Sequence, residues 1–288
     1  MAIRLLSSAD PLERRGAAPA ARGDPIDSTF GTPFDLNLIG LWTLYLKEVR
    51  RFFKVPGQTL AAPVVTTLMF LLIFSLALGR SGRVIEGLPF LEFLAPGLVM
   101  MAVIQNAFAN TSASILIGKI QGNIVDLLMP PLRPGELMFG IVAGGVTRGL
   151  LVAVVVTLAM LPAVPIGLEH PLLVLYYAIS GSLMLALLGL LAGIWAERFD
   201  QMATVTNFVV TPLSFLSGTF YSIAQLPGPF LVAAYLNPFF YLIDGLRFGF
   251  TGHADGPILI GALAVAAVNL GLWLLAHALI ARGYRLKA

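Results

Sequence analysis

Long apolar runs, separated by short polar or basic segments, dominate the sequence after its first thirty residues. Several runs approach the ~20 residues that a helix needs to cross a bilayer. The pattern predicts six transmembrane helices and therefore an all-α, polytopic membrane protein. The predicted spans are Thr59–Gly79, Phe93–Leu116, Glu136–Leu161, Leu172–Trp195, Ala203–Tyr221 and Pro257–Ile280.

A different pattern precedes the first span. From Leu38 to Val55, apolar side chains recur every three or four residues, and basic side chains recur on the opposite face. This spacing predicts an N-terminal amphipathic helix that lies in the membrane interface, with its cations toward anionic headgroups. The basic residues assigned to this helix are Lys47, Arg50, Arg51 and Lys54.

The segment from Ser222 to Gly256 is too apolar for an ordinary loop, yet prolines divide it into pieces too short to span. It predicts external re-entrant or interfacial helices between spans five and six. Within it, Asp244 and Arg247 have the spacing of an ion pair on one helical face. A structural clasp at the outer surface is favoured for this pair over a contact with cargo.

Composition excludes an ordinary soluble protein. Of the 288 residues, 58% are hydrophobic and 11% are charged, against about 25% charged in soluble domains. Of the 18 Lys and Arg residues, fourteen fall on one side of the predicted membrane, three on the other, and Arg148 inside the third span. Because cytoplasmic segments hold most basic residues, both termini are predicted to be cytoplasmic. The basic charge reflects orientation, so no nucleic-acid partner is expected.

The chain divides into two predicted parts. Residues 1–34 are rich in Ala, Pro, Arg and Asp and poor in large apolar groups, which predicts a disordered cytoplasmic tail. Residues 35–288 form the predicted transmembrane domain. Cysteine is absent, so neither a disulfide nor a Cys-based metal site is expected.

The loop between spans two and three carries the most informative pattern, GKIQGNIVDLLMPPLRPGEL from Gly118 to Leu137. A helix over Lys119–Met129 would gather its large apolar residues on one face, and a proline pair would end it. Such a helix is suited to docking on a soluble partner. It is equally suited to resting on lipid headgroups, and the pattern alone leaves both interpretations open.

Several segments, taken in order, resemble ABC-2-type transporter permease subunits: the basic helix before span one, FLAPGLVMM in span two, GNIVDLLMPPLRPGEL, and PLSFLSGTFYSIAQLP followed by LNPFFYLIDGLRFGF. The resemblance implies an exporter in the bacterial inner membrane, in which a homodimer of permease chains forms the translocation path. It also implies that the loop helix is a coupling helix that touches an ABC ATPase dimer. The residues so assigned are Lys119, Gln121, Asn123, Asp126, Leu127 and Leu128.

The sequence itself lacks an ATP site of the P-loop type, which has the form G-x-x-x-x-G-K-[ST]. The only Gly-Lys pair is Gly118-Lys119, and Ala113 and Ile120 occupy the other required positions. The chain is therefore predicted to be neither an enzyme nor a cofactor-binding protein, with ATP and Mg²⁺ on the partner ATPase. An ion-gradient-driven secondary transporter is the alternative, but the intramembrane acidic or His relays expected of one are missing.

Arg148 is the most informative single residue, because it falls near the middle of span three, where a cation costs at least ~2.5 kcal/mol. The candidate partners at similar depth are three amides of span two, Gln105, Asn106 and Asn110. Hydrogen bonding between the two spans is one interpretation. A site for an anionic part of the cargo is the other. The resemblance admits small-molecule, lipid and glycan cargoes together with membrane lipid, and Arg148 favours an anionic amphiphile.

Overall fold

The computed structural model describes residues 37–78, 84–85, 87–124, 126 and 131–285, which form a helical bundle with one small hairpin. The predicted tail, residues 1–34, lies outside the described residues. The elements of the first half are α1 (Leu38–Phe53), η2 (Gly57–Ala61), α2 (Ala62–Leu78), β1 (Val84–Ile85), β2 (Leu88–Pro89) and α3 (Phe90–Ile120). Those of the second half are α5 (Pro134–Met160), α6 (Pro171–Trp195), α7 (Phe199–Val205), η4 (Thr206–Val210), α8 (Thr211–Leu216), η5 (Ile223–Gln225), α9 (Gly228–Leu236), α10 (Pro238–Thr251) and α11 (Ile258–Ala281).

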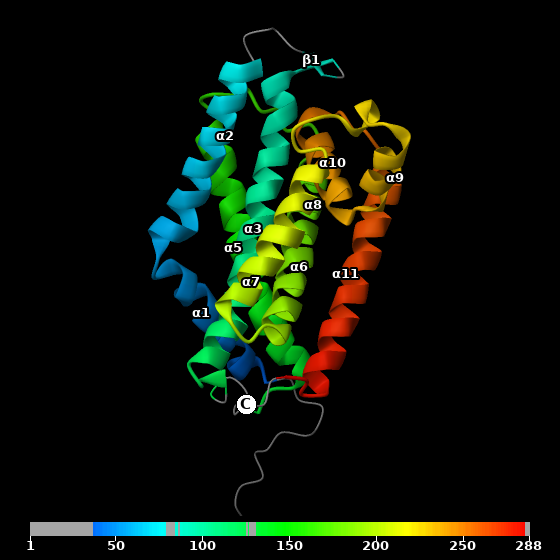
Figure 1. Ribbon diagram of the computed structural model, residues 1–288. Coiled ribbons are helices and arrows are strands. Elements are labelled where there is room, and N and C mark those ends of the chain that lie inside the picture. Colours follow the sequence, from blue (N-terminus) through cyan, green and yellow to red (C-terminus); the bar gives the residue numbers. More distant parts are fainter. Residues whose placement is uncertain (1–36, 79–83, 86, 125, 127–130, 286–288) are drawn as a thin grey trace, which may run out of the picture. The chain divides into compact units, whose positions relative to one another are not determined.

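Helix α3 runs through the middle of the bundle (Figure 1) and is buried over most of its length. It packs against α2, α5, α6 and α10, and α11 packs against α6 and α10. In the described part of the chain, five helices are long and apolar enough to cross a membrane: Gly57–Ala77, α3, α5, α6 and α11. The bent pair α9–α10 would make a sixth if it counted as one span. The prediction of a mostly helical, polytopic membrane protein is confirmed.

Glycines allow the central helices to approach closely. A Cβ added at Gly189 in α6 would lie 2.5 Å from the carbonyl oxygen of Phe108 in α3. A Cβ at Gly145 in α5 would lie 2.7 Å from Cγ2 of Thr111 in α3. Between helices in lipid there is little hydrophobic driving force, so close packing of this kind holds the bundle together.

The predicted fifth span differs from the observed segment. Residues 199–216 form a helical run of α7, the π-helical turn η4 and α8, and this run is not among the five apolar helices found in the described residues. Asp200 and Asn207 lower its mean hydropathy. The predicted end at Tyr221 is wrong, because the helix stops at Leu216 and Gly218 adopts a left-handed conformation with a φ of 74°.

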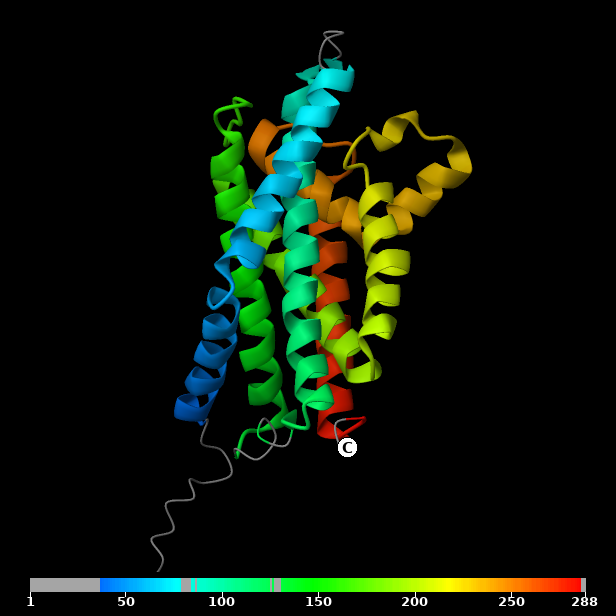
Figure 2. The ribbon, with the colours of Figure 1, turned by 60° about the vertical axis from the view of Figure 1, so that its left-hand side comes forward.

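Between this run and α11, the chain forms the short helices η5, α9 and α10 (Figure 2). The axes of α9 and α10 differ by 84°, and Asn237 lies at the bend. The Asn237 side chain accepts a hydrogen bond from the Phe239 amide at 3.1 Å and donates to the Ser217 hydroxyl at 2.8 Å. This side chain therefore both begins α10 and ties the bend to the end of α8.

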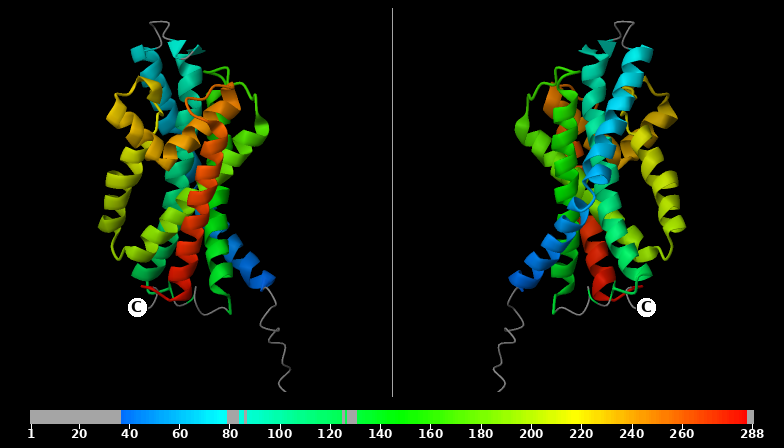
Figure 3. Two further views of the ribbon diagram at one scale, coloured as in Figure 1. Left: turned by 90° about the vertical axis from the view of Figure 1, so that its right-hand side faces the viewer. Right: turned by 90° about the vertical axis from the view of Figure 1, so that its left-hand side faces the viewer.

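The two ends of the bundle differ (Figure 3). One end carries the antiparallel pair β1–β2 and is called the hairpin end. At the other, the Arg133 end, α3 ends, α5 begins and α11 ends. There Glu136 joins the starts of two helices, because its two carboxylate oxygens accept the backbone amides of Asn37 at 2.9 Å and Arg133 at 2.8 Å.

The predicted helix over Lys119–Met129 is wrong at its start. Lys119 and Ile120 form the end of α3, and the chain then turns at Gly122, whose φ is 72°. A positive φ is unfavourable for residues with a Cβ, so glycine permits this end of the span. Ile120 is exposed whereas Ile124 is buried, and the two therefore do not share one exposed apolar face.

Candidate functional site

A polar cavity of about 430 Å³ lies between η2 and α2, α3, α5 and the α7–α8 run. Although the surrounding helices are mostly apolar, amides, hydroxyls and one guanidinium line it. The polar lining residues are Gln58, Thr66, Thr67, Gln105, Asn106, Arg148, Thr206, Asn207 and Thr211. Polar side chains are expensive within a bilayer, so their concentration in one cavity marks a candidate binding site or transport path.

Two π-helical turns contribute to this cavity. Gln58 comes from η2, at the start of the first apolar helix, and Thr206 and Asn207 come from η4. Turns of this kind are rare and occur frequently at functional sites. Their presence in two walls of one cavity supports its assignment as the candidate site.

Arg148 of α5 lines the cavity and donates from Nη2 to Oδ1 of Asn106 at 3.0 Å. This hydrogen bond joins α3 to α5, the helices that correspond to the second and third predicted spans. The Asn106 amide donates in turn to the Ala102 carbonyl at 3.0 Å, which directs its oxygen toward Arg148. The Nε of Arg148 has no hydrogen-bond partner among the described residues. The guanidinium thus keeps a buried N–H donor at Nε that no described residue satisfies.

A second guanidinium reaches α3 one helical turn away. Arg51 of α1 donates to the carbonyl of Asn110 at 2.7 Å and lies 2.8 Å from the Glu48 carboxylate. Ser114 donates to the other oxygen of Glu48 at 2.8 Å. The pKa of Arg51 is lowered, because the effect of burial exceeds the opposing effect of the Glu48 carboxylate. Asn110, predicted as a partner of Arg148, instead binds Arg51.

Glu48 is the acidic residue that the sequence interpretation missed. It lies in α1, before the first span, and is buried beside Gly144, where an added Cβ would lie 2.6 Å from its own Cβ. The Glu48 carboxylate forms an ion pair with Arg51. Within the described part of the chain, Arg148 is therefore left with an amide as its partner and no carboxylate.

Replacing Arg51 by Gln is expected to lower the free energy of unfolding by about 1–3 kcal/mol, because Glu48 would be left buried without its charged partner. Unfolding of the detergent-solubilised protein by sodium dodecyl sulfate measures this. Arg50→Gln is the matched control, since Arg50 is exposed on the same helix. A loss in Arg50→Gln as large as in Arg51→Gln would contradict this role of Arg51.

The other residues assigned to the interface helix lie on its outer side. Leu44 and Glu48 of α1 pack against α5, as the contacts at Gly140 and Gly144 show. Lys47 and Arg50 of α1 are exposed, as is Lys54, which immediately follows the helix.

The residues assigned to ATPase coupling do not form one surface. Lys119 points back into the protein, where its Nζ donates to the carbonyl of Ile194 and, at 3.3 Å, to that of Ala196. Lys119 therefore ties the end of α3 to the end of α6. The exposed members of the set are Gln121, Asn123 and Asp126. Outside the described residues lie Leu127 and Leu128.

The predicted pair of Asp244 and Arg247 is present, with 3.8 Å between Nη1 and Oδ1. Both side chains are buried, so the pair is not at an outer surface as predicted. Asp255, which the sequence did not indicate, is a second carboxylate at 3.8 Å from Nη1. The guanidinium also stacks on the ring of Phe93 at 3.7 Å. These contacts agree with a structural clasp.

Comparisons with known proteins agree with this architecture. Residues 40–251, from α1 to the end of α10, match the family of ABC-2 type transporters. The inner membrane transport permease YadH of Escherichia coli (strain K12) is 37% identical over 253 residues, which cover 88% of this chain and 99% of that protein. Nodulation protein J of Rhizobium leguminosarum bv. trifolii is 27% identical over 241 residues, covering 81% and 89%. The chain therefore belongs to the ABC-2 type transporter family, as the membrane permease subunit of an ABC transporter.

Proposed function

We propose that this permease forms the translocation path of an ATP-driven exporter in the bacterial inner membrane, as a homodimer coupled to a separate ABC ATPase that binds ATP and Mg²⁺. The observation that carries the assignment of the path is the polar cavity among apolar helices. Polar groups at this depth line water-filled passages or substrate sites. The excess of basic residues on one side supports cytoplasmic termini and a cytoplasmic Arg133 end.

Exposed apolar side chains flank the polar cavity and support a second copy as the partner. Leu72 and Ile73 of α2 and Phe208 of η4 are exposed, and both elements contribute walls to the cavity. A second copy that covers these walls would bury apolar surface and enclose the cavity between two chains. The path would then lie at the interface of the homodimer.

The loop at the Arg133 end supplies the contact with the ATPase. A push on the exposed residues Gln121, Asn123 and Asp126 would reach α3 directly. It would pass to the end of α6 through Lys119, and α7 begins at Phe199, shortly after α6 ends at Trp195. Closing of the ATPases on ATP would thus move the walls of the cavity, and the cargo would leave outward or sideways. The re-entrant α9–α10 segment would lie at the outer side of this path.

Two further parts of the proposal concern how α1 is held at the membrane and which cargo Arg148 favours. Exposed Lys47, Arg50 and Lys54 would hold α1 at the cytoplasmic interface through anionic headgroups. Arg148 has no acidic partner among the described residues and would attract an anionic group of the cargo. An amphiphile, such as a lipid, a lipid-linked glycan or a drug with an anionic head, fits this cavity best.

Residues Gln121, Asn123 and Asp126 are called the contact loop. Replacing Asp126 by Lys is expected to reduce, several-fold, the ATP hydrolysis that the permease stimulates in its ATPase, because it reverses the charge of one side chain of this loop. The measurement compares ATP hydrolysis by the purified permease–ATPase complex in vesicles. Glu169→Lys is the matched control, since Glu169 is an exposed carboxylate in the loop between α5 and α6, away from the contact loop.

Two outcomes would overturn the proposal. Equal stimulation by wild-type and Asp126→Lys permease would remove this loop from the coupling path. Transport at the full rate by permease vesicles that contain no nucleotide hydrolase would show that the chain is not the subunit of an ATP-driven exporter.

A further inference from the structure

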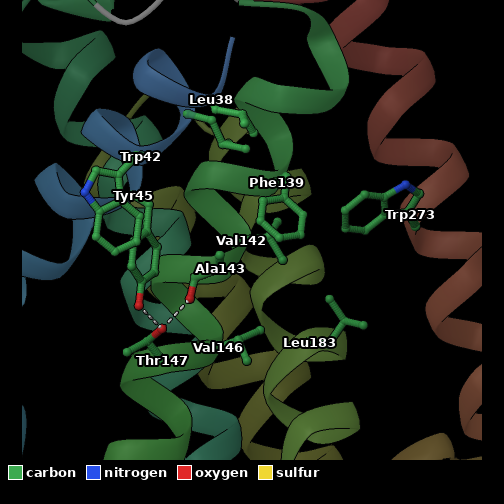
Figure 4. Close-up of a pocket in the computed structure, with 11 residues that line it drawn as sticks. Leu38, Trp42, Tyr45, Phe139, Val142, Ala143, Val146, Thr147, Leu183 and Trp273 are labelled. Atoms are coloured by element: carbon green, nitrogen blue, oxygen red, sulfur yellow. Dashed lines mark hydrogen bonds between the residues drawn. The ribbon is translucent and has the colours of Figure 1, made fainter. Parts of the chain in front are cut away.

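A second cavity, the apolar groove, lies between α1, α5, α6 and α11 (Figure 4). Its volume is about 640 Å³, which is within the range of ligand sites. Val142, Val146 and Leu183 line it, and Trp42 and Trp273 stand on its two sides. The groove is separate from the polar cavity and plays no part in the path proposed above.

The hydroxyl groups in the groove satisfy each other. The Thr147 hydroxyl donates to the carbonyl of Ala143 at 2.9 Å. The Tyr45 hydroxyl, 3.0 Å from Thr147 Oγ1, is therefore the donor of that second bond. None of the described residues that line the groove is charged. A polar ligand would lose its hydration here without gaining partners, whereas a hydrocarbon chain would lose nothing.

The position of the groove determines which hydrocarbon can fill it. Three of its walls, α5, α6 and α11, are long enough and apolar enough to cross a membrane, so their outer surfaces face lipid. Along α5 the groove extends from Phe139, near the Arg133 end, to Thr147, a rise of about 12 Å. It therefore follows the direction in which an acyl chain descends from a headgroup.

The rim of the groove suits a lipid headgroup. Trp42 and Trp273 carry indoles of the kind that concentrate at the membrane interface. His277 is exposed one turn beyond Trp273 on α11, and its ring borders Gly135 in the first turn of α5. Exposed Arg133 immediately precedes that turn. Arg133 and His277 are thus placed near the end of the groove where the headgroup of a lipid would lie.

We propose that the apolar groove binds one acyl chain of a membrane phospholipid from the leaflet at the Arg133 end. The bound chain fills the space between α1, α5 and α11 and so supports the position of α1. The groove is the binding site of a structural lipid, distinct from the cargo.

Native mass spectrometry of the full-length chain, extracted in mild detergent, tests this by counting the phospholipids that stay bound. Ala143→Phe puts an aromatic ring into the groove, and we expect it to lose the retained lipid. Val154→Phe, on the same helix at an exposed position outside the groove, is the matched control and should keep it. Equal retention in the two variants, or no retained lipid in the wild type, would overturn the proposal.

A second measurement leaves Ala143 unchanged and exchanges the groove tryptophans only for Phe, another aromatic ring, so it does not depend on the folding of Ala143→Phe. Two single-tryptophan proteins keep either Trp273, in the groove, or Trp195, outside it, with Phe at the other tryptophan positions. Both are loaded with dibrominated phosphatidylglycerol and then diluted into vesicles of unbrominated phosphatidylglycerol. We expect quenching of Trp273 fluorescence to persist after dilution while that of Trp195 is relieved. Relief of both at the same rate would indicate ordinary bilayer lipid and overturn the proposal.

Discussion

Replacing Arg247 by Met is expected to lower the free energy of unfolding by about 3–5 kcal/mol, because it would remove the guanidinium that two buried carboxylates share. Arg247 is 0% exposed. Its Nη1 lies 3.8 Å from a carboxylate oxygen of Asp244 and 3.8 Å from one of Asp255. Unfolding of the detergent-solubilised protein by sodium dodecyl sulfate measures the loss.

The guanidinium of Arg247 also joins separate elements of the fold. Its Nε donates to the carbonyl of Phe93 in α3 at 3.2 Å, and its Nη2 donates to the carbonyl of Gly218 after α8 at 2.6 Å. Arg247→Lys would keep the charge but could not reproduce this planar set of donors. We therefore expect the Lys variant to be destabilised too, though less than the Met variant.

Arg285→Met is the control for loss of an arginine at an ion pair. Arg285 lies 3.8 Å from Glu197, and the two side chains are 43% and 67% exposed. Exposed pairs contribute about 0–1 kcal/mol, so little change is expected. If Arg247→Met and Arg285→Met lost the same stability, the buried cluster would not be the clasp that its contacts indicate.

The positions of the long helices could be predicted because bilayer thickness sets the length of an apolar run. The predicted span Leu172–Trp195 corresponds to α6, Pro171–Trp195, and the prediction Glu136–Leu161 corresponds to α5, Pro134–Met160. The end of the α7–α8 run could not be predicted. Gly218 ends it through a left-handed turn, and the surrounding sequence stays apolar beyond that point.

Of the residues that line the polar cavity, only the charged one could be predicted, because a charge inside a membrane span has a high energetic cost. Arg148 stood out because a cation in a span needs a partner. Depth gave three candidate amides, and only the packing shows that Asn106 is the one that accepts its hydrogen bond. Gln58 and Asn207 were missed, because uncharged polar residues give a weak signal and π-helical turns shift which side chains face inward. The three-residue spacing of Glu48 and Arg51 could have indicated their pairing.

The inward position of Lys119 had no signal in the sequence. Its partners are carbonyl groups at the end of α6, more than seventy residues away along the chain. Any side chain with donors at the end of α3 could have pointed to solvent instead. Only the packing of α3 beside α6 decides between an internal cap and an exposed coupling residue.

Replacing Arg148 by Gln is expected to weaken the binding of an anionic amphiphile by about tenfold to a hundredfold. A hydrogen bond to a charged group contributes about 1.5–3 kcal/mol, and about 1.4 kcal/mol corresponds to a factor of ten in affinity. Dodecyl phosphate is a suitable probe, and dodecyl maltoside has the same chain without the charge. Binding of each to the permease in lipid nanodiscs is measured by calorimetry.

The choice of Gln separates the two roles open to Arg148. Its amide keeps a hydrogen-bond donor on α5 while the charge is lost, but that donor stands two bonds short of the Nη2 position that contacts Asn106. Arg148→Lys keeps the charge and should keep the preference for phosphate. If Arg148 only held the two helices together, the Gln variant would bind the two probes with the same ratio of affinities as the wild type.

The ratio of the two affinities decides the question more sharply than either affinity alone. A packing defect in the cavity would weaken the binding of dodecyl phosphate and of dodecyl maltoside together, because both alkyl chains would contact the same altered walls. Loss of a cation weakens the binding of dodecyl phosphate alone, since selectivity is a difference between two binding free energies. An unchanged ratio in Arg148→Gln would contradict the proposal of an anionic cargo. A ratio that falls in the Gln variant and is preserved in the Lys variant would assign Arg148 to recognition of the charged head.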